Sequence, residues 1–284
     1  MSAAVEYRGV VKSFPGFTLG PLDFELTRGT VVALVGPNGA GKTTALKCLV
    51  GLIQPDEGTI AVDGRRINDA LWKRALGYVG EEHAFFDNWS GERNLGFLST
   101  FYPAWSDARA GELAERFGLR LDQPVKSLSR GDRAKLSLVS ALAHSPRLLV
   151  LDEPTAGLDP VVRADFLETL WELQEDEERT ILYSTHITSD LERTADFVTF
   201  LQDGRVVFSR PKDEVVGNWG VVKGGREILD DQARAFFEGV REREHGFEGL
   251  TSKLEEARQR FGDHAVIDRA SLDDIMVLMG EGER

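Results

Sequence analysis

A run of glycine, lysine and threonine near the N-terminus has the spacing of a phosphate-binding loop. The run Gly36-Pro37-Asn38-Gly39-Ala40-Gly41-Lys42-Thr43, followed by Thr44, fits the pattern G-x-x-x-x-G-K-[ST] at every position. Glycines let the backbone curl so that its N–H groups point at phosphate oxygens, and the start of the next helix adds a positive partial charge. Lys42 is expected to reach the β- and γ-phosphates, and the Thr43 hydroxyl to ligate Mg²⁺. The run therefore predicts a binding site for a nucleoside triphosphate.

A pair of adjacent carboxylates follows an apolar run later in the chain. Asp152 and Glu153 come directly after Leu148-Leu149-Val150-Leu151, and ligands of parallel sheets bind at the carboxyl ends of the strands. Asp152 has the chemistry to hold Mg²⁺, and Glu153 that of a general base for the attacking water. An acidic pair is weak evidence alone, but behind a phosphate-binding loop it supports the same site strongly.

These motifs need strands and helices to position them, and the hydrophobic pattern predicts an α/β core with a helical insertion. We expect strands at Val5–Val11, Phe17–Leu26, Thr30–Val35, Gly58–Val62, Gly77–Val79, Leu148–Leu151, Thr180–Ser184, Val198–Leu201 and Arg205–Val207. We expect helices at Thr43–Leu52, about 130–144, about 161–174 and Ser271–Met279, the last with an N-cap serine.

Charge and composition limit the classes of protein that the chain can represent. The 284 residues carry 34 basic and 47 acidic side chains, a net charge of −13, so we expect no nucleic-acid partner. The single cysteine, Cys48, cannot form an internal disulfide and suggests a reducing compartment, with its thiol buried. No apolar run reaches the roughly 18 residues of a spanning helix, and the N-terminus has no secretory signal pattern. We therefore expect a cytoplasmic chain that another subunit must anchor at any membrane.

Three further motifs accompany the phosphate-binding loop and the acidic pair. Leu128-Ser129-Arg130-Gly131-Asp132 lies between the loop and the pair, Gly157-Leu158-Asp159 follows the pair, and Ser184-Thr185-His186 follows the next strand. This set of motifs, in this order, resembles the ATP-binding cassette (ABC) ATPases. The resemblance extends over about residues 5–210. It implies an α/β P-loop NTPase fold of the ABC type with an antiparallel β subdomain and a helical subdomain at about 88–145. We place this ATPase domain at residues 1–215 and a packed C-terminal extension, regulatory or dimer-stabilising, at 216–284.

The resemblance also implies roles for residues outside the two main motifs. Phe14 matches an aromatic that stacks on adenine, although it fits a simple core position too. Ser129, with Arg130 and Gly131, matches the signature motif that contacts the γ-phosphate held by the opposite subunit, and Ser129 also fits a helix N-cap. Asp159 matches the loop between the two sites, and His186 matches the switch histidine that positions the γ-phosphate and water.

Two positions depart from the family pattern. The signature is commonly LSGGQ, and here Arg130 and Asp132 occupy its third and fifth positions. Arg130 can pair with a neighbouring carboxylate or favour the phosphate. Glu81 stands where the family usually has a glutamine whose oxygen ligates Mg²⁺ and senses the transport partner. A carboxylate can still ligate Mg²⁺, and otherwise Glu81 is a contact for that partner.

The resemblance implies an ATP- and Mg²⁺-dependent ATPase subunit of a membrane transporter. It would pair with a second ABC subunit, as a homodimer or heterodimer, and drive a separate transmembrane permease at the cytoplasmic face. The motif spelling and the tail are similar to multidrug and antibiotic exporters, which favours export. The alternative is a soluble ABC ATPase acting on nucleic acid, ribosomes or iron–sulfur assembly. Phe85, Phe86 and Trp89 are candidates for the permease contact, or for local core.

Overall fold

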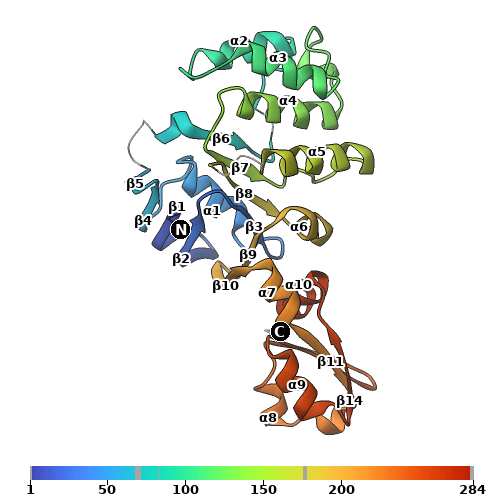
Figure 1. Ribbon diagram of the computed structural model, residues 1–284. Helices are drawn as coiled ribbons and strands as arrows, with labels where there is room; N and C mark the ends of the chain where they lie inside the picture. Colours follow the sequence, from blue (N-terminus) through green and yellow to red (C-terminus); the bar gives the residue numbers. More distant parts are fainter. Residues whose placement is uncertain (1, 68–71, 83, 175–177, 282–284) are drawn as a thin grey trace.

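A computed structural model of the chain describes residues 2–67, 72–82, 84–174 and 178–281. Three sheets organise these residues, and Figure 1 shows how they follow one another through the molecule. A six-stranded sheet lies in the middle, a four-stranded sheet from the N-terminal residues lies beside it, and a second four-stranded sheet forms the C-terminal end.

The central sheet has the strand order β10-β9-β3-β8-β7-β6, parallel except for the edge strand β10, which forms a hairpin with β9. Side chains of β3 alternate between two cores, since Ala33 packs on one face and Leu34 on the other. This two-sided burial explains why the strand is continuously apolar. The strands are β3 (Val31–Val35), β6 (Leu76–Val79), β7 (Leu148–Asp152), β8 (Thr180–Thr185), β9 (Phe197–Gln202) and β10 (Arg205–Pro211).

The N-terminal sheet is antiparallel, with the order β2-β1-β4-β5. Its inner face shares one core with the first helix, α1, and with β3, where Leu22, Ile60 and Leu46 are fully buried. This packing holds the segment between β3 and α1 against the sheet. The strands are β1 (Ala3–Phe14), β2 (Phe17–Thr27), β4 (Glu57–Val62) and β5 (Arg65–Arg66).

Helices follow the strands of the central sheet or form the helical layer at the top of Figure 1. Among the helices up to residue 218, four begin at a serine or aspartate whose side chain accepts a backbone N–H of the first turn, the N-cap arrangement. The helices up to residue 218 are α1 (Lys42–Leu49), α2 (Gly91–Ser99), α3 (Asp107–Arg116), α4 (Arg130–Leu142), α5 (Pro160–Leu173), α6 (Thr188–Thr194) and α7 (Lys212–Asn218). Short 3-10 turns occur at Trp72–Ala75, Val125–Ser127 and Arg226–Ile228.

The C-terminal residues form a sheet of their own, in the order β12-β13-β11-β14 with every neighbouring pair antiparallel. The element order β11-α8-β12-β13-α9-β14 is the β-α-β-β-α-β arrangement, and α10 follows it. The sequence pattern predicts none of these strands, which are known only from the structure. The elements are β11 (Gly220–Gly224), α8 (Asp231–Arg234), β12 (Gly239–Arg243), β13 (Gly246–Thr251), α9 (Leu254–Phe261), β14 (Ala265–Arg269) and α10 (Leu272–Glu281).

Most predicted element bounds agree with the structure within a few residues. Strand β10 continues to Pro211, four residues past the predicted end at Val207, and α1 ends earlier than predicted. The pattern predicts this helix through Leu52, but it ends at Leu49. Gly51 has φ +69°, and the N–H groups of Gly51 and Leu52 bond back to the carbonyls of Cys48 and Lys47. A left-handed glycine of this kind ends a helix. None of the helices in the described part of the chain is long and apolar enough to cross a membrane.

Candidate active site

The phosphate-binding loop joins β3 to α1, and its backbone requires glycine at both ends. Gly36 has φ +151° and a Cβ there would lie 2.0 Å from the carbonyl oxygen of Leu201. Gly41 has φ +104° and a Cβ there would meet Leu19 at 2.7 Å. A side chain at either position would therefore force the loop away from the core. The predicted strand–loop–helix context of a phosphate site is present.

Lys42 begins α1 and turns its ammonium group back over the loop. Its Nζ donates to the carbonyl oxygens of Gly36 at 2.8 Å and Pro37 at 3.2 Å, and lies 3.6 Å from Glu153 Oε1. The side chain is only 6% exposed, so its charge is held at the loop rather than in solvent. A cation fixed here matches the charge of a phosphate group.

The residues around Asp152 fit a magnesium ion. Asp152 ends β7, is buried, and accepts the hydroxyls of Thr43 at 3.1 Å and Ser184 at 2.7 Å through Oδ1. Its Oδ2 has no hydrogen-bond partner within the part of the chain that the structure describes. A buried carboxylate oxygen without a donor is costly unless a cation faces it. Because Mg²⁺ prefers one or two carboxylates together with hydroxyl, water and phosphate oxygens, Asp152 and Thr43 are a suitable pair of ligands.

Glu153 and His186 form a hydrogen-bonded pair at the same edge of the sheet. The Nδ1 of His186 lies 2.9 Å from Glu153 Oε2. An ionised carboxylate only accepts, so Nδ1 carries the proton and Nε2 is left for another partner. Glu153 has φ +48°, a strained value for a residue with a side chain, and its N–H is fixed by the Ser184 hydroxyl at 2.8 Å. The backbone is thus constrained to present this carboxylate.

A buried aspartate, Asp190, connects the segments that carry these two residues. Its Oδ2 accepts the hydroxyl of Thr155 at 2.7 Å, and its Oδ1 accepts both Nε and Nη2 of Arg163, at 2.9 and 2.7 Å. Thr155 follows Glu153, Arg163 lies on α5, and Asp190 lies on α6, four residues after His186. The loop after β7 is thereby tied to both helices. The motif pattern does not identify Asp190, Arg163 or Thr155.

One cavity of about 590 Å³ is lined by half of the predicted site residues. Its lining comprises Phe17, Asn38, Gly39, Gly41, Lys42, Thr43, Thr44, Glu81, Ala156, Glu153 and His186. Glu81 therefore opens onto the same space as Lys42 and Glu153. Burial, and then the negative charges of Asp152 and Glu81, raise the pKa of Tyr78 on β6 to about 12.

Phe14, the residue predicted to stack on adenine, does not line the cavity. Phe14 is 40% exposed at the end of β1 and packs beside Lys12, whose Nζ lies 5.8 Å from the ring centre. Phe17, its partner across the turn into β2, is the aromatic that lines the cavity. The role of Phe14 stays a prediction. No role for Phe17 was predicted from the sequence. The signal for it was its position on the other side of the Pro15-Gly16 turn from Phe14.

The signature residues lie at the start of α4 and are not among the residues that line this cavity. Ser129 caps the helix, accepting the N–H of Asp132 at 3.1 Å and donating to its carboxylate at 2.8 Å. The guanidinium of Arg130 lies directly over Gly157, where an added Cβ would meet its Nη1 at 2.4 Å. Asp159 caps α5 by accepting two N–H groups at 3.1 Å. Arg130 of the signature thus packs on Gly157 of its own chain.

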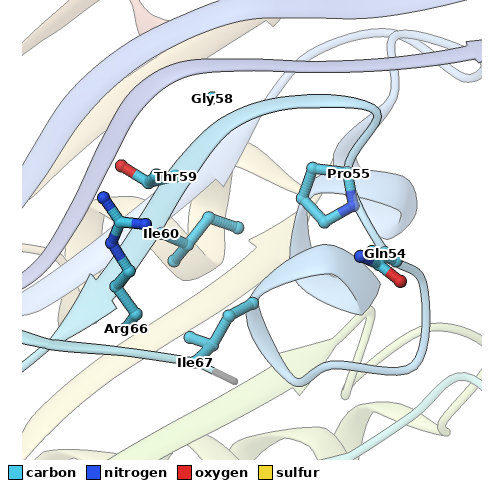
Figure 2. Close-up of a pocket in the computed structure, with 7 residues that line it drawn as sticks. All are labelled: Gln54, Pro55, Gly58, Thr59, Ile60, Arg66 and Ile67. Carbon is cyan, nitrogen blue, oxygen red and sulfur yellow. The ribbon is translucent and has the colours of Figure 1, made fainter. Parts of the chain in front are cut away.

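A second, smaller hollow of about 110 Å³ lies beside β4 and β5 (Figure 2). Figure 2 shows Arg66 and Thr59 on one side of it and Gln54 and Pro55 on the other. The complete lining is Gln54, Pro55, Gly58, Thr59, Ile60, Arg66 and Ile67. This lining offers no carboxylate, imidazole or thiol, so it lacks the acid–base and metal-binding groups present in the larger cavity.

The fold and the larger cavity define a P-loop nucleotide-binding protein. The family described as ABC transporter matches residues 19–156 of the chain. A solved structure described as the ATP binding subunit of an ABC transporter superposes with a TM-score of 0.68 and 31% identity, covering 75% of this chain and 91% of that one. The chain belongs to the ABC transporter ATP-binding family, whose enzymatic activity is ATP hydrolysis coupled to transport. The predicted family and fold class are thereby confirmed.

Relatives with similar sequence identity to this chain are named for the transport of different substrates. The lantibiotic transport ATP-binding protein SrtF of Streptococcus pyogenes is 35% identical over 201 residues, which are 69% of this chain and 85% of SrtF. The molybdenum import ATP-binding protein ModC of Paramagnetospirillum magneticum is 35% identical over 211 residues, which are 70% of this chain and 58% of ModC. Similarity at this level establishes an ATP-binding subunit of a transporter, and it does not separate export from import.

Proposed function

We propose that ATP is bound and hydrolysed in the 590 Å³ cavity by the side chains that the sequence motifs name. The observation that carries this proposal is the convergence of Lys42, Thr43, Asp152, Glu153 and His186, which come from three separate segments, at one end of the central sheet. Such convergence of a phosphate-binding cation, a metal-binding carboxylate and a base is what phosphoryl transfer to water requires.

Each side chain has a distinct task in this proposal. The loop N–H groups and Lys42 hold the β- and γ-phosphates, and Thr43 and Asp152 hold Mg²⁺. When bound, Mg²⁺ neutralises the charge that develops on the phosphates. Glu153 accepts a proton from the attacking water, and His186, oriented by its bond to Glu153, directs Nε2 toward the γ-phosphate.

Glu81 is proposed as a further oxygen ligand for Mg²⁺, because it lines the same cavity as Thr43. We expect Glu81→Gln, which keeps a side-chain oxygen, to retain most ATPase activity. Glu81→Ala should raise the Mg²⁺ concentration needed for half-maximal activity by about tenfold, the scale expected for loss of a metal contact. The measurement is phosphate release against free Mg²⁺, with Glu82→Ala at the exposed neighbouring position as the matched control. An unchanged Mg²⁺ requirement in Glu81→Ala would show that Glu81 is not a ligand and favour its contact with the permease.

We propose that two such subunits pair, as a homodimer or with a different ABC subunit, so that Ser129, Arg130 and Gly131 face the ATP of the opposite chain. The place of these residues away from the cavity of their own chain supports the pairing. Asp159, at the start of α5, would then lie between the two sites. Residues 216–284 are proposed as a separate extension of the ATPase domain at 1–215.

A surface cluster of aromatic side chains is the proposed contact with the separate transmembrane subunit. Phe86 lies 4.3 Å from Trp89 and 5.5 Å from Phe97, and Phe97 lies 5.2 Å from Phe101, as ring centres. Phe86, Phe97 and Phe101 are each more than 40% exposed. Phe85, in contrast, packs against the core. Exposed aromatics gathered on one patch are typical of an interaction site, and they would hold the chain at the cytoplasmic face of a membrane.

Affinity purification of the tagged chain from detergent-solubilised membranes tests the assignment. Recovery of a polytopic membrane protein, lost in Phe97→Ser and Phe101→Ser variants, supports the transporter subunit. Recovery of ribosomes, RNA or soluble assembly proteins alone would contradict it. We propose export as the direction, on the similarity of the motifs and tail to exporter subunits. ATP-driven uptake of a labelled lantibiotic into inside-out vesicles supports export, and ATP-driven release from them contradicts it.

A further inference from the structure

The last helix of the chain, α10, is bonded to the helix that follows His186. The hydroxyl of Thr188 donates to Asp273 Oδ1 at 2.6 Å. Thr188 is the first residue of α6, two positions after His186, and is 8% exposed. Asp273 lies in the first turn of α10. A residue from the C-terminal region, 85 positions further along the chain, therefore reaches the segment that carries the switch histidine.

Helix α10 is held to the ATPase domain at its other end as well. The side chain of Gln202, at the end of β9, donates to the carbonyl oxygen of Met279 at 3.0 Å. The apolar side of α10, with Leu272, Ile275 and Leu278, belongs to the same continuous buried cluster as Leu191 of α6. In Figure 1, α10 lies between the ATPase domain and the C-terminal sheet. Helix α10 is thus bonded to α6 near its start and to β9 near its end, and its apolar side is packed in the core.

His186 is restrained directly by its bond to Glu153 and indirectly by the segments on either side of it. Thr185, its predecessor, ends β8 and pairs with Val35 of the central sheet. On its other side, Ile187 contributes no side-chain cap to α6. Several side-chain bonds set the position of α6, including those of Asp190 to Thr155 and Arg163 and that of Thr194 to Tyr183. The Thr188–Asp273 bond adds a restraint at the first residue of the helix, two positions after His186. A small displacement of α6 would move the imidazole relative to Glu153.

We propose that α10 is a strut that positions His186 for ATP hydrolysis, and that Asp273 is a positioning residue of the ATPase site. The C-terminal region is then part of the machinery that sets the hydrolysis rate. This inference rests on the proposed role of His186. Beyond that role, the Thr188–Asp273 bond links the C-terminal region to ATP hydrolysis.

The test compares the steady-state kcat and the KM for ATP in variants on both sides of the bond. Thr188→Val removes the hydroxyl donor at nearly constant size, and Asp273→Ala removes the acceptor from the exposed side. We expect each to lower kcat by about tenfold, the scale of a small misplacement, with KM for ATP within about twofold of the wild type. Thr188→Ser and Asp273→Asn keep a donor and an acceptor, and should restore kcat.

A matched control separates positioning from simple loss of stability. Thr199→Val deletes a buried threonine hydroxyl that bonds Ser209 at 2.9 Å on β9 and β10, away from His186. This variant should lose thermal stability to a similar extent as Thr188→Val and keep the wild-type kcat. Equal kcat losses in the two variants would overturn the proposal, as would a wild-type kcat in both Thr188→Val and Asp273→Ala.

The final arm repeats the substitutions in a His186→Ala background, with hydrolysis followed over hours under single-turnover conditions. We expect no further loss from Asp273→Ala there, because the group that it positions is gone. A further tenfold loss would show that Asp273 acts independently of His186 and would overturn the strut. If His186→Ala itself keeps the wild-type kcat, the proposed role of His186 fails. If His186→Ala is slow and Asp273→Ala is not, only the strut fails.

Discussion

Glu153→Gln removes the basic oxygen from the residue that we assign as general base while keeping the size of its side chain. In the native chain, Glu153 Oε2 accepts the His186 Nδ1–H at 2.9 Å and Oε1 lies 3.6 Å from Lys42 Nζ. The glutamine oxygen can still accept from His186, so the orientation of the imidazole should persist. Loss of general-base assistance costs about 10²–10⁴-fold in rate, equivalent to about 2.7–5.5 kcal/mol in activation free energy.

ATP binding should survive the same substitution. Lys42 keeps its two carbonyl partners, so its buried ammonium is not left unpaired. The lost carboxylate also removes a negative charge beside the triphosphate, which favours binding. We therefore expect affinity for a fluorescent ATP analogue to equal or exceed that of the wild type. Because hydrolysis separates the proposed ATP-bound pair, Glu153→Gln should elute as a dimer on size-exclusion chromatography in Mg·ATP.

The assays are phosphate release at saturating Mg·ATP and nucleotide titration on the same preparations. Glu172→Gln is the matched control, since Glu172 is an exposed carboxylate on α5 that pairs with Arg116. An exposed pair of this kind contributes about 1 kcal/mol or less to stability, and its loss should leave turnover unchanged. Turnover of Glu153→Gln within about threefold of the wild type would refute its role as general base. Loss of ATP binding would instead make it a binding residue.

Two further predictions concern side chains away from the site. Burial lowers the pKa of the His144 imidazole from 6.5, so as pH falls the unfolded chain takes up a proton at a higher pH than the native chain does. The urea midpoint of the wild type should therefore fall as pH drops from 7.5 to 5.5, and His144→Gln should reduce that dependence; equal slopes in the two proteins would contradict the assignment. Burial raises the pKa of the Cys48 thiol to about 11, so a disulfide reagent at pH 8 should label it only after unfolding. Stoichiometric labelling of the native protein within minutes would show that the thiol is accessible.

The chemistry of phosphate binding made the centre of the site predictable from the sequence. A backbone that must approach phosphate closely demands glycine at Gly36 and Gly41, and the ligands and base must follow buried strands at fixed places. These requirements act over a few neighbouring residues, so they leave a readable pattern. The strand at Val31–Val35 is present as the pattern predicts, and the motif residues Lys42 and Glu153 line one cavity.

Contacts between distant segments were decided only by the tertiary structure. The C-terminal strands are short and rich in glycine, and Gly220 pairs with both Thr251 and Arg269. Their burial depends on the neighbouring strands and on α10, so no local periodicity marks them. The bonds of Asp190 to Thr155 and of Thr188 to Asp273 join residues 35 and 85 positions apart. A hydroxyl and a carboxylate are common groups at any protein surface, so only the fold shows which of them are bonded to each other.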